Sequence, residues 1–96
     1  MSGFVYILEC ADGSYYVGST TDLGRRIREH EEGLGGQYTR KRLPVKLVYA
    51  EEHPTIAEAY HREKQIQGWS RKKRKALIDS RIDDLKVLAR KKFKDK

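Results

Sequence analysis

The sequence predicts an α/β fold of the α+β type, in which a small three-stranded antiparallel sheet is flanked by helices. Two runs rich in β-branched and aromatic residues, 4–8 and 15–17, are separated by Asp12 and Gly13, as is typical of a hairpin. A third run, 45–50, alternates apolar and polar residues. Helical spacing and N-capping residues predict the order strand, strand, helix, strand, helix, helix, with one more helix at the C-terminus.

The length of the first turn decides which hairpin side chains share a face, because a one-residue change of register reverses the faces of a strand. A two-residue turn would put Tyr6 and Tyr16 on opposite faces of the sheet. A three-residue turn over 11–13, with Gly13 in the left-handed conformation, would pair Tyr6 with Gly18 and put both phenols on one face. In that register we expect Gly18 to leave an open floor for a substrate backbone.

A helix is expected over about 22–33, because Asp22 is a good N-cap and apolar residues then recur every four positions. On this helix Asp22, Arg26 and His30 lie on one side. That row is either a solvated face, in which Asp22 pairs with Arg26, or part of a site with the two phenols of the hairpin.

A polar, basic loop is expected after the glycines that end this helix. It carries Arg40, Lys41 and Arg42, which either are simply solvated or contact phosphates. The strand over 45–50, with Val45, Leu47 and Tyr49 in alternation, is expected to join the hairpin, because two strands alone are marginal in water.

Residues 51–54 are expected to turn the chain into a second long helix with Thr55 as its N-cap. The buried positions expected on this helix are Ile56, Ala59, Tyr60 and Ile66. Glu63 falls inside that apolar stripe, where an unpaired carboxylate is costly. It is therefore expected either to form an ion pair with a nearby Arg or Lys or to hold a cation.

A break at Trp69 and Ser70 precedes a third helix, which Ser70 can cap. The first turns of this helix carry Arg71, Lys72, Lys73, Arg74 and Lys75. Because cations at a helix N-terminus oppose the helix dipole, we favour contact with nucleic acid over a purely solubilising role. Residues 80–96 are expected to add a basic C-terminal helix or tail.

Charge and composition point to a polyanionic partner. The net charge is +7, and residues 61–96 hold 14 of the 21 Lys and Arg residues but only five of the 14 Asp and Glu residues. Nucleic acid, most simply DNA, is the expected partner, and a basic membrane-surface helix is the rival interpretation. The single Cys10 excludes an internal disulfide and is expected to be a small apolar strand residue. One domain over 1–96, a monomer, no membrane segment or signal peptide and a cytoplasmic location are expected.

Several of these residues together resemble the GIY-YIG nuclease domain, which intron homing endonucleases, some restriction enzymes and a nucleotide-excision-repair nuclease share. The resemblance is carried by Val5-Tyr6, Tyr16-Val17-Gly18, the turn over 18–23, Arg26, His30 and Glu63. It extends to about Ile78 and is closest to the small stand-alone bacterial members.

The resemblance implies a metal-dependent DNA endonuclease, with a possible role in DNA repair or recombination. Glu63 would hold Mg²⁺ or Mn²⁺, and Arg26 would bind the scissile phosphate. Tyr6 would be the general base, provided that nearby cations favour its phenolate, with Tyr16 and His30 orienting the water or relaying the proton. No separate targeting domain is visible, so little sequence specificity and a possible accessory targeting protein are expected.

Two departures from the family pattern stand out. Phe4 replaces the usual first Gly, and the chain contains no Asn, although many members carry one after the catalytic Glu. A nucleic-acid-binding module without hydrolysis is therefore an alternative, as is a small scaffold whose charge only secures solubility.

Overall fold

The computed structural model describes residues 2–80 and contains the sheet that the sequence predicts. Strands β1 (Gly3–Glu9), β2 (Tyr15–Thr20) and β3 (Lys46–His53) are antiparallel, in the order β2-β1-β3. The part of the basic C-terminal helix or tail predicted beyond residue 80 lies outside the described residues. No helix within residues 2–80 combines the length and the apolar character needed to span a membrane.

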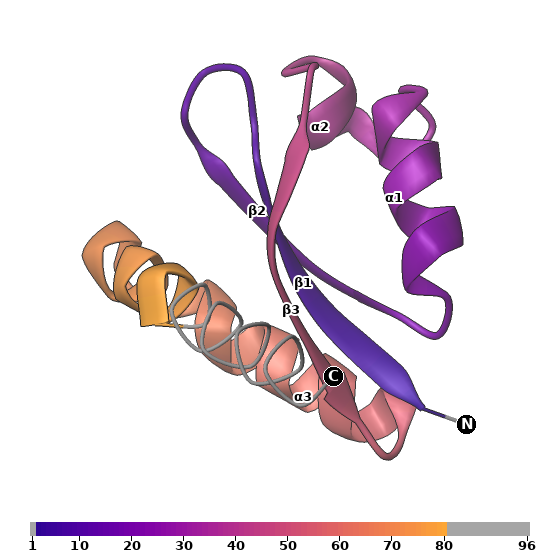
Figure 1. Cartoon of the computed structure of the whole chain (residues 1–96), viewed down its shortest axis with the longest axis vertical. Coiled ribbons are helices and arrows are strands. Elements are labelled where there is room, and N and C mark those ends of the chain that lie inside the picture. Colours follow the sequence, from indigo (N-terminus) through magenta and orange to yellow (C-terminus); the bar gives the residue numbers. More distant parts are fainter. Residues whose placement is uncertain (1, 81–96) are drawn as a thin grey trace, which may run out of the picture.

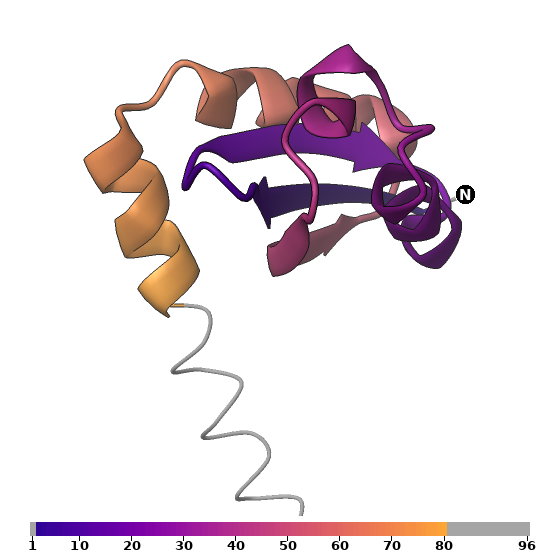
Figure 2. The same cartoon turned by 90° about the horizontal axis from the view of Figure 1, so that it is seen from above.

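Helices cover both faces of this sheet. Figure 1 shows α1 (Leu23–Glu31) and the short α2 (Gln37–Arg40) on one side, and α3 (Ile56–Gln67) on the other. Residues 71–80 are also helical, with the Ser70 hydroxyl accepting a hydrogen bond from the Lys73 amide as a cap. In Figure 2 this last helix turns away from the direction of α3.

The hairpin has the three-residue turn. Tyr6 pairs with Gly18 and Leu8 with Tyr16, and Gly13 adopts the left-handed conformation with φ of 84°. Tyr6 and Tyr16 therefore lie on the same face of the sheet, which is the register that a shared site requires.

β1 is the central strand, and its buried side chains divide between two clusters. Val5 and Ile7 pack toward α3 with Ala59 and Ile66. On the opposite face Tyr6 and Leu8 belong to a second cluster, which also contains Cys10 and Val45 and against which Leu23 and Ile27 of α1 pack. Full burial of one large apolar side chain contributes roughly 1.5–3 kcal/mol, so β1 supports both layers. Cys10, predicted to be a small apolar strand residue, is buried but follows the last residue of β1.

The predicted alternation of β3 is wrong in one respect. A β-bulge opposite Ile7 and Leu8 inserts an extra residue into β3, so that Val45 and Tyr49 enter different core clusters and Leu47 is 39% exposed. β3 also runs on to His53, where the sequence predicted a turn, because pairing with β1 continues as far as Gly3.

Two further predictions are corrected. Residues 37–40 form α2 rather than an open loop, because Asp12 of the hairpin turn pairs with Arg42 at 3.0 Å and Arg42 donates to the Tyr38 carbonyl. Ile56 and Tyr60 are 39% and 55% exposed, because the face of α3 against the sheet is set by Ala59, Glu63 and Ile66.

Candidate active site

The sequence-predicted site residues on the α1 side of the sheet come together around Tyr6. The ring centroids of Tyr6, Tyr16 and His30 are 5.2–6.3 Å apart. The Tyr6 ring lies across Gly18, where a Cβ atom would overlap its hydroxyl group. The predicted open floor at Gly18 is therefore wrong, because the Tyr6 side chain itself fills that space.

A line of hydrogen bonds leads from Tyr6 into the interior. The Tyr6 hydroxyl lies 2.9 Å from Nε2 of His30, and Nδ1 of His30 lies 2.9 Å from the Thr39 hydroxyl oxygen. Thr39 donates to the Gly36 carbonyl at 3.5 Å, so its oxygen is left to accept from His30 Nδ1–H. Nε2 of a neutral His30 then accepts the proton of the Tyr6 hydroxyl.

Burial controls the ionisation of both groups. Burial raises the pKa of Tyr6, with the neighbouring Tyr16 raising it further and Arg26 opposing this in part. Burial also lowers the pKa of His30, and the charge of Arg26 lowers it further. At neutral pH the chain alone thus holds a neutral phenol against a neutral imidazole, and the nearby guanidinium does not suffice to favour a phenolate.

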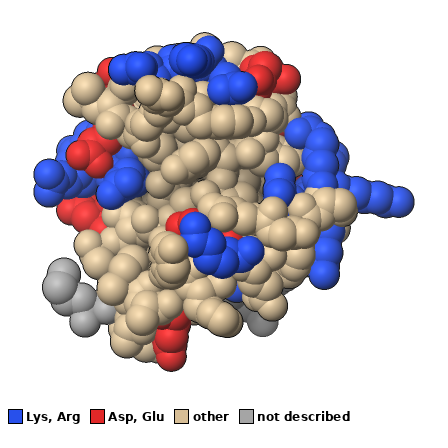
Figure 3. Space-filling model, turned by 180° about the vertical axis from the view of Figure 1, so that it is seen from behind, with Lys and Arg blue, Asp and Glu red and all other residues tan. Residues whose placement is uncertain are grey.

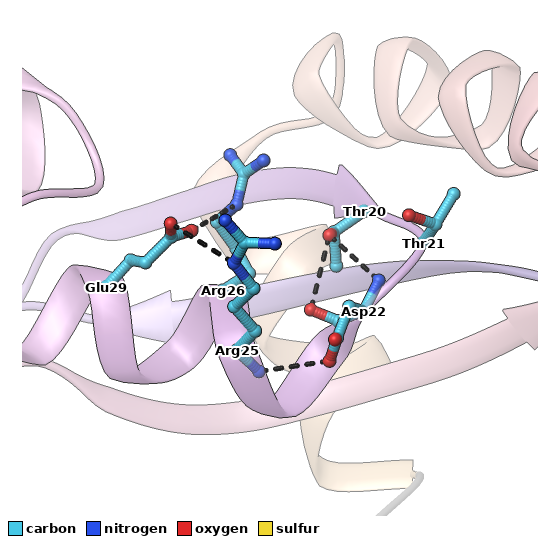
Figure 4. Close-up of a pocket in the computed structure, with 6 residues that line it drawn as sticks. All are labelled: Thr20, Thr21, Asp22, Arg25, Arg26 and Glu29. Carbon is cyan, nitrogen blue, oxygen red and sulfur yellow. Dashed lines mark hydrogen bonds and ion pairs between the residues drawn. The ribbon is translucent and has the colours of Figure 1, made fainter.

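Arg26 lies at the margin of this cluster. Its Nε is 3.2 Å from the Glu29 carboxylate, which also pairs with Arg25 at 3.7 Å. Asp22 caps α1 by accepting from the Arg25 amide, and no Asp22–Arg26 ion pair occurs in the described structure. Arg26 lines a pocket of about 220 Å³, and Figure 4 shows its walls coming from the end of β2 and from α1.

Glu63 reaches the site from the opposite layer. It is 8% exposed on α3, and its Oε1 accepts from the Ser19 hydroxyl at 2.7 Å. β2 is an edge strand, with no strand beside its outer side. Side chains from the α3 side and from the α1 side of the sheet can therefore approach each other around this free edge. Glu63 is close enough to Tyr6 to raise the pKa of that phenol.

The surroundings of Glu63 fit a hard divalent cation. Its Oε2 accepts from the Gln67 amide at 2.8 Å, and the only cation paired with it among residues 2–80 is the half-exposed Lys64, at 3.3 Å. The hydrogen bonds to this carboxylate therefore come from neutral donors, and its charge is opposed within the described chain only by that ammonium group. No group of three or more acidic, His or Cys side chains in the described chain is suited to a metal ion, so water and phosphate oxygens would complete the shell.

The predicted nucleic-acid-binding residues differ in exposure and in whether other groups of the protein already hold their side chains. Arg40 and Lys41 are exposed, whereas Arg42 is held by Asp12 and stacks on Tyr38 at 3.8 Å. Arg74 donates to the carbonyls at the end of α3. The remaining members of the basic run are all exposed, although some contact neighbours: Arg71, Lys72, Lys73 and Lys75.

The view from behind shows how charge is distributed around the free edge of β2. Figure 2 places β2 on that side of the sheet, away from β3. In Figure 3 Lys and Arg side chains lie at the top, left and right margins of this face, some beside Asp or Glu, and a further basic group lies near its middle next to acidic atoms. A polyanion crossing the face would meet cations on several sides.

Three supporting residues were missed by the sequence analysis: Ser19, Thr39 and Gln67. Gln67 follows Glu63 by four residues on one helix, which is a signal that the sequence contains. Ser19 and Thr39 meet their partners only through tertiary contacts, so no local pattern identifies them.

Comparison with known proteins gives consistent matches. A family model described as the GIY-YIG catalytic domain matches residues 2–76. A UPF0213 protein of Haloquadratum walsbyi is 46% identical over 80 residues, covering 83% of this chain and 90% of that protein. A UPF0213 protein of Streptococcus sanguinis is 45% identical over 81 residues, covering 84% and 93%.

Two solution NMR structures have similar folds. That of the UPF0213 protein from Bacillus halodurans has 46% identity and a TM-score of 0.54, covering 82% of this chain and 84% of that one. That of a protein from E. faecalis has 36% identity and a TM-score of 0.57, covering 83% and 85%. The name UPF0213 states no activity.

Proposed function

Because this chain belongs to the GIY-YIG catalytic domain family, we propose that it is a metal-dependent endonuclease that hydrolyses phosphodiester bonds in DNA. Little intrinsic sequence specificity and a role in DNA repair or recombination are part of the proposal. One observation carries it: the rings of Tyr6, Tyr16 and His30 lie 5.2–6.3 Å apart, and the Tyr6 hydroxyl is hydrogen-bonded to His30 at 2.9 Å. A phosphate-binding cation, a carboxylate and a proton acceptor are the groups that such hydrolysis needs.

Tyr6 and His30 together would remove the proton of the attacking water. As the water gives a proton to the Tyr6 oxygen, Tyr6 passes its own proton to Nε2 of His30. The product is a hydroxide that attacks phosphorus and an imidazolium supported by Thr39 at Nδ1. This route needs no stable phenolate, which the raised pKa of Tyr6 disfavours. Tyr16 would orient the water through its position beside both rings.

Arg26 would bind the scissile phosphate. Its guanidinium offers a planar fork of donors that matches two phosphate oxygens, and Glu29 holds it in place at 3.2 Å. A lysine would supply the charge without the fork, so it should not replace this function fully.

Glu63 would hold the Mg²⁺ or Mn²⁺ ion, with Ser19 and Gln67 fixing the orientation of the carboxylate. When bound, such an ion would stabilise the negative charge that develops on the phosphate and the leaving oxygen. The exposed cations, Arg40, Lys41 and the run Arg71–Lys75, would bind the DNA backbone without reading its sequence.

A non-catalytic nucleic-acid-binding module is the second candidate. The ion pair between Glu63 and Lys64 favours it, since a cation already occupies one side of the carboxylate. In that case DNA would bind in a salt-dependent manner and stay intact.

The deciding experiment compares four proteins on branched and linear DNA with Mg²⁺ and with Mn²⁺. Wild type and Arg28→Ala should cleave, because Arg28 is an exposed arginine of the same helix that does not line the pocket of Arg26. Arg26→Ala and Glu63→Gln should lose roughly 10²–10³-fold in rate, as expected for removal of one charge-stabilising group. Wild-type protein that binds without cutting would establish the binding module instead, and identical products from all four would overturn the nuclease proposal.

A further inference from the structure

We propose that the free edge of β2 carries a subsite for one unpaired nucleotide, directly beside the reacting groups. The inference rests on the proposed nuclease function and names its substrate class: nucleic acid in which the base next to the scissile phosphate is not paired. Single strands, flaps and the open regions of branches contain such bases, whereas an intact duplex does not.

A cavity of about 240 Å³ at this edge forms the subsite. It is lined by Tyr15, Tyr16, Val17, Tyr38, Gln67 and Arg74. Pockets for drug-sized ligands occupy roughly 300–1,000 Å³, so this one suits a single base rather than a base pair. Tyr15 and Tyr16 point to opposite faces of the sheet, and both can line one cavity only because it opens at the strand edge.

The lining has the chemistry of a base-stacking site. Tyr38 is 40% exposed, and its ring lies 6.0 Å from that of Tyr16 at an interplanar angle of 31°. Guanidinium groups lie against two of the rings: Arg42 is 3.8 Å from the Tyr38 centroid and Arg71 is 4.5 Å from the Tyr15 centroid. Aromatic faces for bases combined with cations for the backbone are the usual means of holding a single strand.

The cavity and the reacting groups share residues. The Tyr16 ring is 5.2 Å from the His30 ring, on the Tyr6 side of the cavity. The Gln67 amide donates both to the Val17 carbonyl and to Glu63. A base in the cavity would therefore leave its own phosphate beside Tyr6 and Glu63. A paired base cannot enter without leaving the helical stack, which costs free energy that an unpaired base does not pay.

Tyr38 is the residue that tests this subsite, because it lines the cavity without belonging to the proposed catalytic set. Tyr38→Leu removes the aromatic face, and Tyr38→Phe is the matched control that keeps the ring. Binding is measured with single-stranded DNA and RNA oligonucleotides that contain 2-aminopurine, whose fluorescence is quenched by stacking. All proteins in this measurement carry Glu63→Gln and are kept free of divalent metal, so that binding is measured without cleavage.

The proteins with Tyr38 and with Tyr38→Phe should both quench the fluorescence, and both should bind a single strand more tightly than the matched duplex. Tyr38→Leu should weaken single-strand binding by about 5- to 150-fold, the effect of losing one base–aromatic stack, while duplex binding changes little. Comparison of DNA with RNA shows whether the sugar matters. Equal binding of duplex and single strand, or no effect of Tyr38→Leu, overturns the subsite even if the protein cuts DNA. Stacking by a protein that never cuts supports the subsite and rejects the nuclease function.

Discussion

The phenolic oxygen of Tyr6 lies 2.9 Å from Nε2 of His30, although the two residues are 24 positions apart in the chain. Both side chains are almost fully buried. Because a buried hydrogen bond is costly to leave unmade, this contact links β1 to α1. It also couples the two groups that are proposed to remove the proton of the attacking water.

His30 should control the acid side of the pH profile. Burial and Arg26 lower its pKa, so it stays neutral as the pH falls to its ordinary value of about 6.5, and the cleavage rate should decline only below that. His30→Gln should cleave roughly 10²-fold or more slowly, and its rate should no longer decline at low pH in this way. The exposed His61→Gln serves as the control. A profile unchanged in His30→Gln would contradict the proposed role.

His30 should also make folding weaker in acid. Its folded-state pKa is lowered, so the unfolded chain binds a proton more readily. The titration of His30 should therefore not change the free energy of unfolding above about pH 6.5, and should lower it as the pH drops from there toward the lowered pKa. Urea titrations of wild type and His30→Gln across this range measure the free energy of unfolding of both proteins. The difference between them should be constant at high pH and should change as the pH falls.

Thr39→Val should disturb His30 without touching the substrate. It keeps the side-chain volume but removes the oxygen that accepts from His30 Nδ1, 2.9 Å away. An unsatisfied buried donor costs about 1–3 kcal/mol, which urea unfolding should show. The cleavage rate should also fall. Without the Thr39 oxygen, the proton of the neutral His30 ring can move from Nδ1 to Nε2, and Nε2 can then no longer accept the proton of the Tyr6 hydroxyl. Thr39→Ser, which retains the hydroxyl, should largely preserve the rate.

Two glycines provide a matched pair of substitutions. Gly18→Ala should abolish most activity and destabilise the fold, since the new methyl group would overlap the Tyr6 hydroxyl. Gly24→Ala, within α1, has no neighbour within 4 Å and should stabilise the protein by about 0.5–1 kcal/mol through helix propensity. Cleavage assays and thermal unfolding of both variants test this contrast, and an active Gly18→Ala would show that Tyr6 does not need its observed position.

Lys64 should compete with a metal ion for Glu63. Its ammonium lies 3.3 Å from Oε2, and it is half exposed. Lys64→Ala should tighten Mn²⁺ binding about two- to five-fold, the modest effect expected of an exposed ion pair, whereas Lys64→Arg should not. Calorimetric Mn²⁺ titration measures both. Weaker binding in Lys64→Ala would indicate that Glu63 is not the metal ligand.

Glu51 should matter for stability and not for cleavage. Burial tends to raise its pKa, but hydrogen bonds from Tyr49, His53 and Arg62 outweigh this and lower the pKa from its ordinary value. The contribution of this carboxylate to stability should be present above the ordinary pKa of a Glu and be lost as the pH falls through the lowered pKa. Glu51→Gln should reduce unfolding free energy by about 1–3 kcal/mol, with the exposed Glu52→Gln as control.

Local chemistry made much of the fold predictable. The left-handed Gly13, the caps Asp22, Thr55 and Ser70, and the apolar β1 all act over a few residues, so their consequences can be derived from spacing. The errors occurred where distant segments meet. The bulge that redirects β3, and the Asp12–Arg42 contact that orders the segment of α2, depend on pairing across the fold.

The sequence by itself determined the hairpin, the order of helices and strands, and which residue types are available for phosphate chemistry. Only the tertiary structure decided that Glu63, on α3, is held by Ser19 of β2 and by Gln67, and that His30 lies between Tyr6 and Thr39. The physical reason is the strand order: the two layers can meet beside Tyr6 because β2 is at the edge of the sheet, and that order is set by the burial of β1 between both layers.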